Sequence, residues 1–267
     1  MRVVALALAL AASGAPPTER KGGDPVYATV ELHGRVVLDA RATQAGVPAV
    51  TFDHWRHRRL YTCRVCHVDL GFAMKAGESQ VTAASNEGGE HCGACHDGKR
   101  LHDGRPIFHA CAGWPKADPA RGCTRCHTGP NVGAGAGYEE LKRTMPLDAA
   151  GDVDWAAAAR RSLITPVDHV DGITEKRATM RIDRDVEIRP MSTWMNGVIF
   201  SHRKHVAWIG CELCHPEIFP VTRRGQVKYD MEAMRAGRFC GACHQNVAFP
   251  LSTCQRCHVG EDGRAVR

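Results

Sequence analysis

Six copies of the pattern Cys-x-x-Cys-His recur along this chain of 267 residues. They fall into two groups of three, and each group follows a His-x-x-His pair, at His54 and His57 and at His202 and His205. This repetition constrains the fold more than any other feature, because each copy commits two thiols and an imidazole to one short stretch of backbone. The cysteines are Cys63, Cys66, Cys92, Cys95, Cys123, Cys126, Cys211, Cys214, Cys240, Cys243, Cys254 and Cys257, and the histidines that follow them are His67, His96, His127, His215, His244 and His258.

Cys-x-x-Cys-His is the attachment signature of c-type haem. The two thiols form thioethers to the haem vinyl groups, and the next imidazole faces the iron as its proximal ligand. Zinc ribbons also use paired Cys-x-x-Cys, but they do not require a histidine directly after the second cysteine. Histidine is 15 of 267 residues, so six such histidines would arise by chance with a probability on the order of one in ten million or less. A disulfide scaffold would give these histidines no role, and we therefore predict six covalent haem c groups.

The two groups of motifs are short for the haems that they would carry, at residues 54–127 and 202–258. Aromatic residues make up only 6% of the chain, and segments of this size rarely fold on their own apolar surface without a staple. We expect the haems to be that staple and the apoprotein to be largely unfolded. The predicted fold is a multihaem cytochrome c of small α+β type, with mostly irregular chain, short helices, an N-terminal β-hairpin in each module and a haem-filled core.

Four segments are expected along the chain. A positive start and an apolar run from Val3 to Ala12 predict a signal peptide in residues 1–15, and this run is too short to span a bilayer core of about 30 Å. A first triheme module with a leading hairpin around His33-Gly34 is predicted in residues 25–130, and a haem-free linker with short helices in residues 131–184. The second module is predicted in residues 185–267, where Asn196-Gly197 is the preferred type I′ hairpin turn between two β-runs.

The formal net charge of +6 does not indicate a nucleic-acid partner. Six haems bring about −12 in propionates, partly offset by ferric iron, so the holoprotein should be near neutral or mildly acidic. No basic run with interleaved aromatic residues is present. Because bacteria attach haem covalently outside the inner membrane, we expect a periplasmic protein with no membrane span in its mature form. Secretion or outer-membrane association are the alternatives.

Nine histidines remain once six are assigned as proximal ligands. On a helix, His-x-x-His brings two imidazoles close enough to serve neighbouring haems, so His54, His57, His202 and His205 are predicted to be ligands. His33 and His169 are expected to lie on the surface. Cys111 is the one cysteine outside the motifs, and we expect a buried, inert thiol.

A β-run, F-x-H-x-x-H and three Cys-x-x-Cys-His motifs with CGACH in the middle together resemble the cytochrome c7-type triheme family, which is related to the cytochromes c3. The resemblance covers about residues 52–127 and 185–258. It implies that the first histidine of each pair ligates the first haem of its module and the second ligates the middle haem. The implied pairs are His54 with His67, His57 with His96, His202 with His215, and His205 with His244.

The third haem of each module departs from the family pattern. Family members have a histidine, or in some multidomain members a methionine, just before the middle motif. The second module has Met231 and Met234 there, and the resemblance favours Met234 opposite His258, with Met231 as the alternative and two core methionines as a further reading. In the first module Asn86 replaces the methionine. The sixth position of the His127 haem stays open between His91, Met74, His102, His109 and a vacant or water-bound site.

The sequence predicts an electron carrier rather than an enzyme. Haems packed into so few residues must lie close together, and the protein then sets their potentials through ligands, hydrogen bonds and burial. We expect redox partners in anaerobic periplasmic respiration, with a quinol-oxidising membrane complex on one side and a terminal reductase or outer-membrane conduit on the other. A multihaem reductase with an open haem in the first module, and a subunit of a larger cytochrome complex, are the alternatives.

Overall fold

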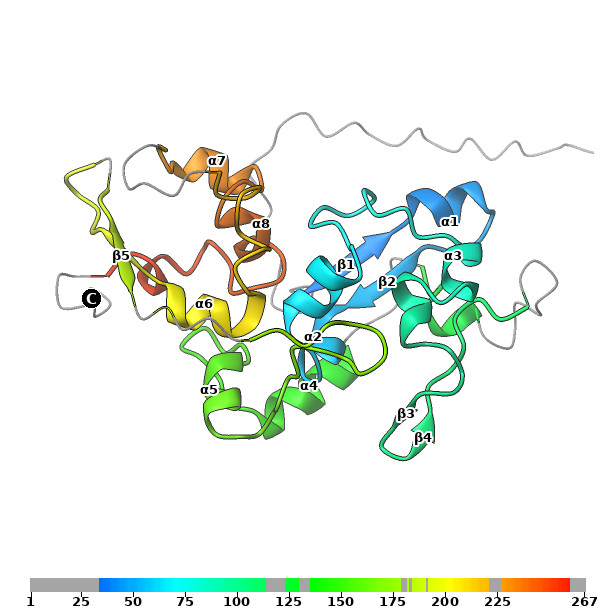
Figure 1. The fold of residues 1–267 in the computed structure, drawn as a ribbon. Coiled ribbons are helices and arrows are strands. Elements are labelled where there is room, and N and C mark those ends of the chain that lie inside the picture. The colour runs from blue at the N-terminus through cyan, green and yellow to red at the C-terminus, as the bar shows by residue number, and fades with distance from the viewer. Residues whose placement is uncertain are drawn as a thin grey trace, which may run out of the picture.

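The computed structural model describes residues 34–113, 123–129, 135–178, 182, 184–190, 192–220 and 227–259. In this part of the chain, short helices and three two-stranded antiparallel sheets are joined by irregular chain (Figure 1). This agrees with the predicted small α+β class. The predicted signal peptide and the first run of the predicted leading hairpin lie outside the described residues.

In the first module, strand β1 pairs with strand β2, placing Arg35 opposite Asp53. The Arg35 Nε lies 2.9 Å from the Asp53 Oδ1, and this buried ion pair fixes the register. The predicted hairpin around His33-Gly34 has its first run outside the described residues, and β1 pairs across helix α1 with the strand that leads into the His-x-x-His pair. The elements are β1 (Arg35–Leu38), α1 (Ala40–Gln44), β2 (Val50–Asp53), α2 (His54–Arg58), the π-helical turn η2 (Val65–Asp69), α3 (Ala83–Glu87), the 3-10 turn η3 (His91–Ala94), β3 (Leu101–His102), β4 (Arg105–Pro106) and the 3-10 turn η4 (Cys123–Arg125).

The central segment forms helices α4 (Gly135–Thr144) and α5 (Trp155–Arg160). The sequence predicts one or two helical turns at residues 138–145 and a helix at residues 154–160. The Asp154 side chain caps α5 by accepting the Ala157 N–H at 2.8 Å. Helix α4 starts earlier than expected, inside the glycine-rich stretch that was predicted to be a linker. Its apolar face packs on α2 and forms a small hydrophobic core, which comprises Trp55, Tyr138, Leu141 and Val153 with Met145 and Trp155 packed against them.

The second module begins with a hairpin in which Ile188 of strand β5 lies opposite Val198 of strand β6. The hairpin was predicted, but its tight Asn-Gly turn was not correct, because residues 189–197 separate the strands. The Asn196 and Gly197 carbonyls instead accept hydrogen bonds from His258 and the Val259 N–H. The elements are β5 (Asp185–Ile188), β6 (Val198–Ser201), α6 (His202–Ile209), α7 (Met231–Arg235), α8 (Gly241–His244) and the 3-10 turn η5 (Cys254–Arg256).

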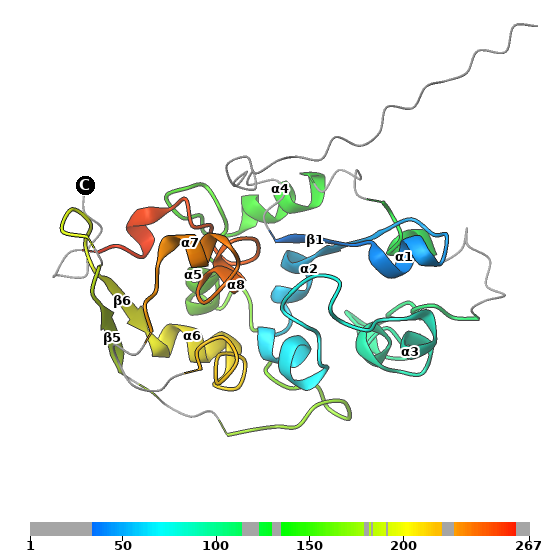
Figure 2. The same cartoon turned by 90° about the horizontal axis from the view of Figure 1, so that it is seen from above.

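The two modules lie side by side, and the central segment packs along both of them (Figures 1 and 2). Direct contacts also join the modules. The Gly34 N–H donates to the Asn246 carbonyl at 2.6 Å, and Arg58 Nη1 lies 3.4 Å from the Val247 carbonyl. The second module is tied to the central segment by an ion pair between Arg256 and Asp148.

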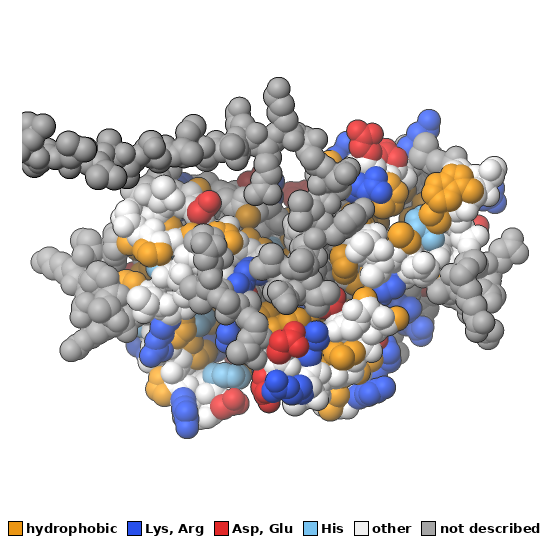
Figure 3. Space-filling model, turned by 180° about the vertical axis from the view of Figure 1, so that it is seen from behind, with side chains coloured by type: hydrophobic (Ala, Val, Ile, Leu, Met, Phe, Trp, Pro, Cys, Tyr) orange, Lys and Arg blue, Asp and Glu red, His pale blue; other side chains and the backbone are white. Residues whose placement is uncertain are grey.

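The surface carries mixed charge on the face seen in Figure 3, where basic side chains lie singly or in small groups with acidic ones between them. Of the helices in the described residues, none has both the length and the apolar character needed to cross a membrane.

Candidate functional site

A cavity of about 3480 Å³ runs through both modules. It is several times larger than the pockets of roughly 300–1,000 Å³ that hold one small ligand. Both modules contribute to a single interior space, which has room for several large groups rather than one. Ten of the twelve motif cysteines line it: Cys63, Cys66, Cys92, Cys95, Cys123, Cys126, Cys214, Cys240, Cys243 and Cys257.

Each His-x-x-His pair begins a helix directly after a strand. Asp53 before α2 and Ser201 before α6 have nearly the same backbone angles, with φ of −96° and −95° and ψ of 104° and 106°. The chain therefore turns from strand to helix in the same way in both modules. This turn places the two imidazoles at the start of each helix.

A phenylalanine holds the two imidazoles of each pair. The Phe52 ring lies 4.8 Å from the ring of His54, edge to face, and stacks 4.7 Å from that of His57. Phe200 repeats this arrangement with His202 and His205 at 4.9 Å and 4.3 Å. The F-x-H-x-x-H pattern contains both phenylalanines, but this contact was not predicted from it. Their recurrence two residues before each pair was the signal that could have found them.

Three of the four implied histidine pairs face each other across the cavity. The ring centroids of His54 and His67 are 6.3 Å apart and the rings are nearly parallel. The centroids are 6.2 Å apart for His57 with His96 and also for His205 with His244. Two imidazoles on opposite sides of one metal ion should have centroids roughly 6 Å apart, because each metal–nitrogen bond is about 2 Å long and the ring centre lies about 1 Å further back. All three pairs have the spacing that one shared iron requires.

Backbone carbonyls hold most of the predicted ligands by their Nδ1 atoms. A carbonyl can only accept, so Nδ1 carries the proton and Nε2 keeps its lone pair for a metal, as is usual for histidine ligands. The acceptors are Gly34 for His54, Phe72 for His67, Pro48 for His127, Arg184 for His202, Ser201 for His205, Phe219 for His215, Phe249 for His244 and Asn196 for His258, at 2.6–3.1 Å.

Burial favours the neutral form of six of the predicted ligands. Desolvation lowers the pKa of His54, His57 and His244 to about 4, and it also lowers the pKa of His67, His96 and His205. The neutral imidazole is the form that binds a metal. Burial likewise raises the pKa of motif thiols, to about 12 for Cys66, Cys92 and Cys243. These residues suit a neutral, apolar group with a metal at its centre.

The fourth implied pair is not brought together in the same way. Ring contact between His202 and His215 is not found among the described residues, although a backbone carbonyl holds each ring. The first site of the second module is therefore the more open one. Ligation by this pair stays a prediction.

The third sites of the two modules correspond in the structure. A Cβ added to Gly93 would collide with the backbone carbonyl of Asn86, and one added to Gly241 would collide with that of Met234. Each glycine of a CGACH motif thus packs on the residue seven positions before it. This supports the alignment of Asn86 with Met234. Ligation of the His258 iron by Met234 or Met231 stays a prediction.

The competitors for the sixth position of the His127 site lie in different surroundings. His91 packs against Phe72, with ring centroids 5.2 Å apart, on the side of the first site. His102 is exposed beside Asp103. Met74, His91, His102 and His109 all line the large cavity. No contact joins any of these four side chains to His127 in the described part of the chain, and the ligand there stays open.

Cys111 lies next to Asn86, a contact that no sequence pattern indicated. The Asn86 amide is 8% exposed, and its Nδ2 lies 3.7 Å from the Cys111 Sγ. The prediction of a buried thiol is only half right, because Cys111 is partly exposed. None of the 13 cysteines forms a disulfide, and the described residues contain no group of three or more His, Cys, Asp or Glu side chains placed to hold a single metal ion.

Comparison with known proteins gives one family. The model described as "Cytochrome c7 and related cytochrome c" matches residues 50–128 and 198–259, which is more than half of the chain. No curated protein matches.

Three solved structures are similar to most of this chain. The C-terminal hexaheme fragment of GSU1996 is 22% identical, covers 85% of this chain and 98% of that one, and has a TM-score of 0.27. The N-terminal hexaheme fragment is 24% identical, with 85% and 99% covered and a TM-score of 0.25. The dodecaheme cytochrome c GSU1996 is 21% identical, with 85% and 74% covered and a TM-score of 0.26.

Proposed function

Because the chain belongs to the family of cytochrome c7 and related cytochromes c, we propose that it is an exported hexahaem protein that relays electrons between redox partners. Membership makes it a multihaem c-type cytochrome with two c7-type modules in tandem. The number of haems, their ligands and the direction of electron flow go beyond membership. We propose modules of residues 25–130 and 185–267 around a haem-free segment of residues 131–184.

The observation that carries this proposal is the spacing of the three facing histidine pairs. Each pair combines one histidine of a His-x-x-His pair with one of a Cys-x-x-Cys-His motif, at 6.2–6.3 Å between centroids. Two imidazoles that hold one iron between them would leave it no position for a substrate. A bound haem then supplies exchange of one electron between ferric and ferrous iron.

The chain contributes attachment, orientation and exclusion of water at each site. The cysteine pairs would hold the group at one edge, and backbone carbonyls fix the orientation of eight of the imidazoles about their ligating nitrogens. Burial disfavours charge near the metal, and ligand identity and burial together set the potential. These roles need no acid, base or nucleophile, and they support a carrier rather than an enzyme.

The proposed place of action is the periplasm, reached through the signal peptide of residues 1–15. The proposed partners are a quinol-oxidising membrane complex and a terminal reductase or outer-membrane conduit. The composition supports this view, because a holoprotein near neutrality has no strong preference for polyanions. Purification of the native protein from a periplasmic extract, with its size in solution, would test both the location and assembly into a larger complex.

Mass spectrometry of the mature protein tests the haem count. We expect the mass of the processed chain plus six haem groups, and ferric EPR with low-spin signals from every histidine-paired iron. A protein that carries fewer haems, or that folds without colour, would overturn the proposal.

One observation keeps a reductase as a second candidate. Asn86 occupies the position that corresponds to Met234, and an amide is a poor iron ligand next to a thioether or an imidazole. If none of the competing side chains reaches the His127 iron, that iron is open to a small ligand. A high-spin ferric signal that disappears on addition of cyanide or nitrite would favour this candidate.

A further inference from the structure

Arg58, the last residue of α2, lies inside the junction between the modules. Its guanidinium carbon is 5.1 Å from the centroid of the Trp155 ring and 5.3 Å from that of Trp208. Its Nη1 donates to the Val247 carbonyl at 3.4 Å, and its Nε is fully shielded and has no hydrogen-bond partner. These neighbours carry no formal charge, and Arg58 lines the large cavity.

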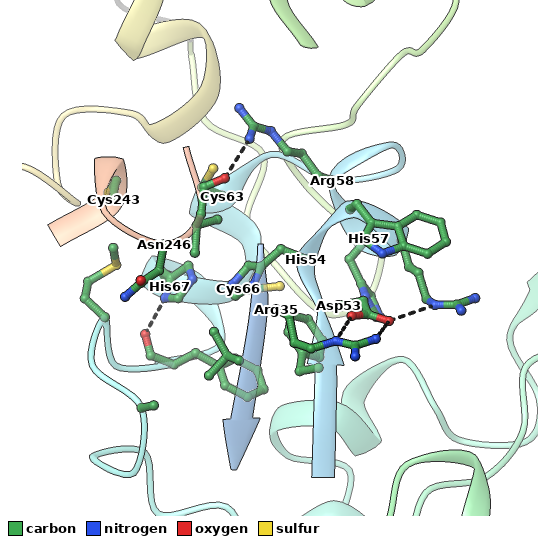
Figure 4. Close-up of a pocket in the computed structure, with 18 of the residues that line it drawn as sticks. Arg35, Asp53, His54, His57, Arg58, Cys63, Cys66, His67, Cys243 and Asn246 are labelled. Atoms are coloured by element: carbon green, nitrogen blue, oxygen red, sulfur yellow. Dashed lines mark hydrogen bonds and ion pairs between the residues drawn. The ribbon is translucent and has the colours of Figure 1, made fainter. Parts of the chain in front are cut away.

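Two sites in different modules surround this guanidinium. In the first module it interacts electrostatically with Cys63 and with the imidazole of His54. In the second module it interacts with Cys243 and with the imidazole of His244. Figure 4 shows Arg58 and Cys63 beside Cys243 of α8, with His54 and Asn246 close by.

The two sites also adjoin each other. Cys63 and Cys243 lie close enough for their side chains to interact electrostatically, and Cys63 interacts with Cys214 as well. The hydrogen bond from Gly34 to Asn246 ties the same two parts of the chain together. The first site of module one and the middle site of module two therefore meet at the junction, with Arg58 between them.

A fixed positive charge raises the reduction potential of a nearby haem iron. Reduction of a ferric iron adds one electron and removes one positive charge, so a nearby cation favours the reduced form. This effect is strong where water is excluded and screening is weak. Burial lowers the pKa of Arg58, but a guanidinium starts from so high a pKa that it keeps its charge at any working pH. Its position between two indole faces holds it in place.

We propose that Arg58 sets the reduction potentials at the module junction, making the site of Cys63 and Cys66 and the site of Cys240 and Cys243 easier to reduce than they would be without it. Arg58 acts as a positioning charge and touches neither iron. This inference rests on the proposed function, because it needs haem at both sites. It also implies that electrons pass between the modules through these two sites.

The test is a redox titration of the intact holoprotein, followed by visible absorption, with dithionite as the source of electrons. Arg58→Gln removes the charge and keeps much of the size, and Arg58→Lys keeps the charge. Arg59→Gln is the matched control, because Arg59 is the next residue and is exposed.

We expect R58Q to shift one or two of the six reduction steps to more negative potential and to leave the others in place. R58K should lie close to the wild type, and R59Q should not differ from it. Equal titrations for R58Q and R59Q, in proteins with the same haem count, would overturn the inference.

Haem counting separates this failure from failure of the proposed function. A wild-type protein without six haems rejects the function, whereas six haems with unmoved potentials reject only the role of Arg58. If R58Q does not accumulate, titration of the wild type at two ionic strengths still decides the question. A partly buried charge is screened less by salt than an exposed one, so potentials at the junction that follow ionic strength like the other steps would overturn the inference.

Discussion

Met234 in the second module occupies the position of Asn86 in the first module. The side chain there is a thioether in one module and an amide in the other. Both residues lie in a short helix before a CGACH motif, and both have their backbone carbonyl against the glycine of that motif. The two modules therefore share this local backbone contact and differ in the side chain it presents, an amide at Asn86 and a thioether at Met234. A thioether ligand raises the potential of a haem relative to an imidazole, so this one difference can separate the potentials of two otherwise similar modules.

Replacing Met234 by histidine tests its role. If Met234 ligates the His258 iron, M234H should move one reduction step to clearly more negative potential and leave the haem count at six, as measured by redox titration. Met231→His is the matched control on the same helix and should leave that step in place. The reverse outcome, with only M231H moving the step, would assign Met231 instead.

Most residues of the candidate sites could be predicted from the sequence. The backbone groups that hold their side chains in place could not. The six motifs and the two His-x-x-His pairs follow from spacing alone. The carbonyls of Gly34, Phe72 and Pro48 that hold the histidines could not be predicted, because every residue has a carbonyl and only the fold decides which one is near. The proximity of Asn86 to Cys111 has the same origin.

The same packing of two short helical elements occurs in both modules. Helix α3 packs on η3 in the first module as α7 packs on α8 in the second, and a glycine makes each contact possible. A side chain at Gly93 or Gly241 would force the helix away from the motif and displace the cysteines that follow.

Gly93→Ala should therefore destabilise the holoprotein severely, by several kcal/mol or to the point of failed accumulation, as overpacking against backbone does. Thermal unfolding followed by absorption measures the effect. Gly88→Ala is the control from the same region, because its added Cβ would lie 3.2 Å from the Ala84 carbonyl, which is tight but tolerable. A G93A protein as stable as G88A would contradict the packing described.

The elements that the sequence predicted best are those with local signals. Helix α5 has an acidic cap and an alanine-rich body, and it forms as expected. The Asn-Gly turn was wrong in detail, because the Asn196 carbonyl accepts a hydrogen bond from His258, a residue distant in sequence. Local propensity gives way to tertiary contacts in short elements.

On the scale of the whole molecule, the central segment contributes most of a small core of packed side chains. Tyr138 is 6% exposed, and its hydroxyl lies 3.3 Å from the Asp152 Oδ1. Burial, and then the neighbouring carboxylate, raise the pKa of Tyr138 to about 12 from an ordinary value of 10.0. This segment connects both modules, so its stability affects the whole chain.

This shift predicts a loss of stability in alkali. Between pH 10 and 12 the unfolded chain has lost the Tyr138 proton and the folded chain keeps it, so the free energy of unfolding falls as pH rises through this window. Denaturant unfolding at several pH values measures the slope. Tyr138→Phe should have a shallower slope above pH 10 and an unchanged slope near pH 8, and an identical slope in both proteins would contradict the shift.

Gly34 connects His54 of the first module to Asn246 of the second module by hydrogen bonds. Its carbonyl accepts hydrogen bonds from both the backbone N–H and the Nδ1 of His54, while its own N–H donates to Asn246. Its φ of +82° suits glycine better than any other residue. A displacement of the loop after His244 would therefore move Gly34 and rotate the His54 imidazole. The spectrum of an iron bound by His54 would then change when the contact between the two modules opens.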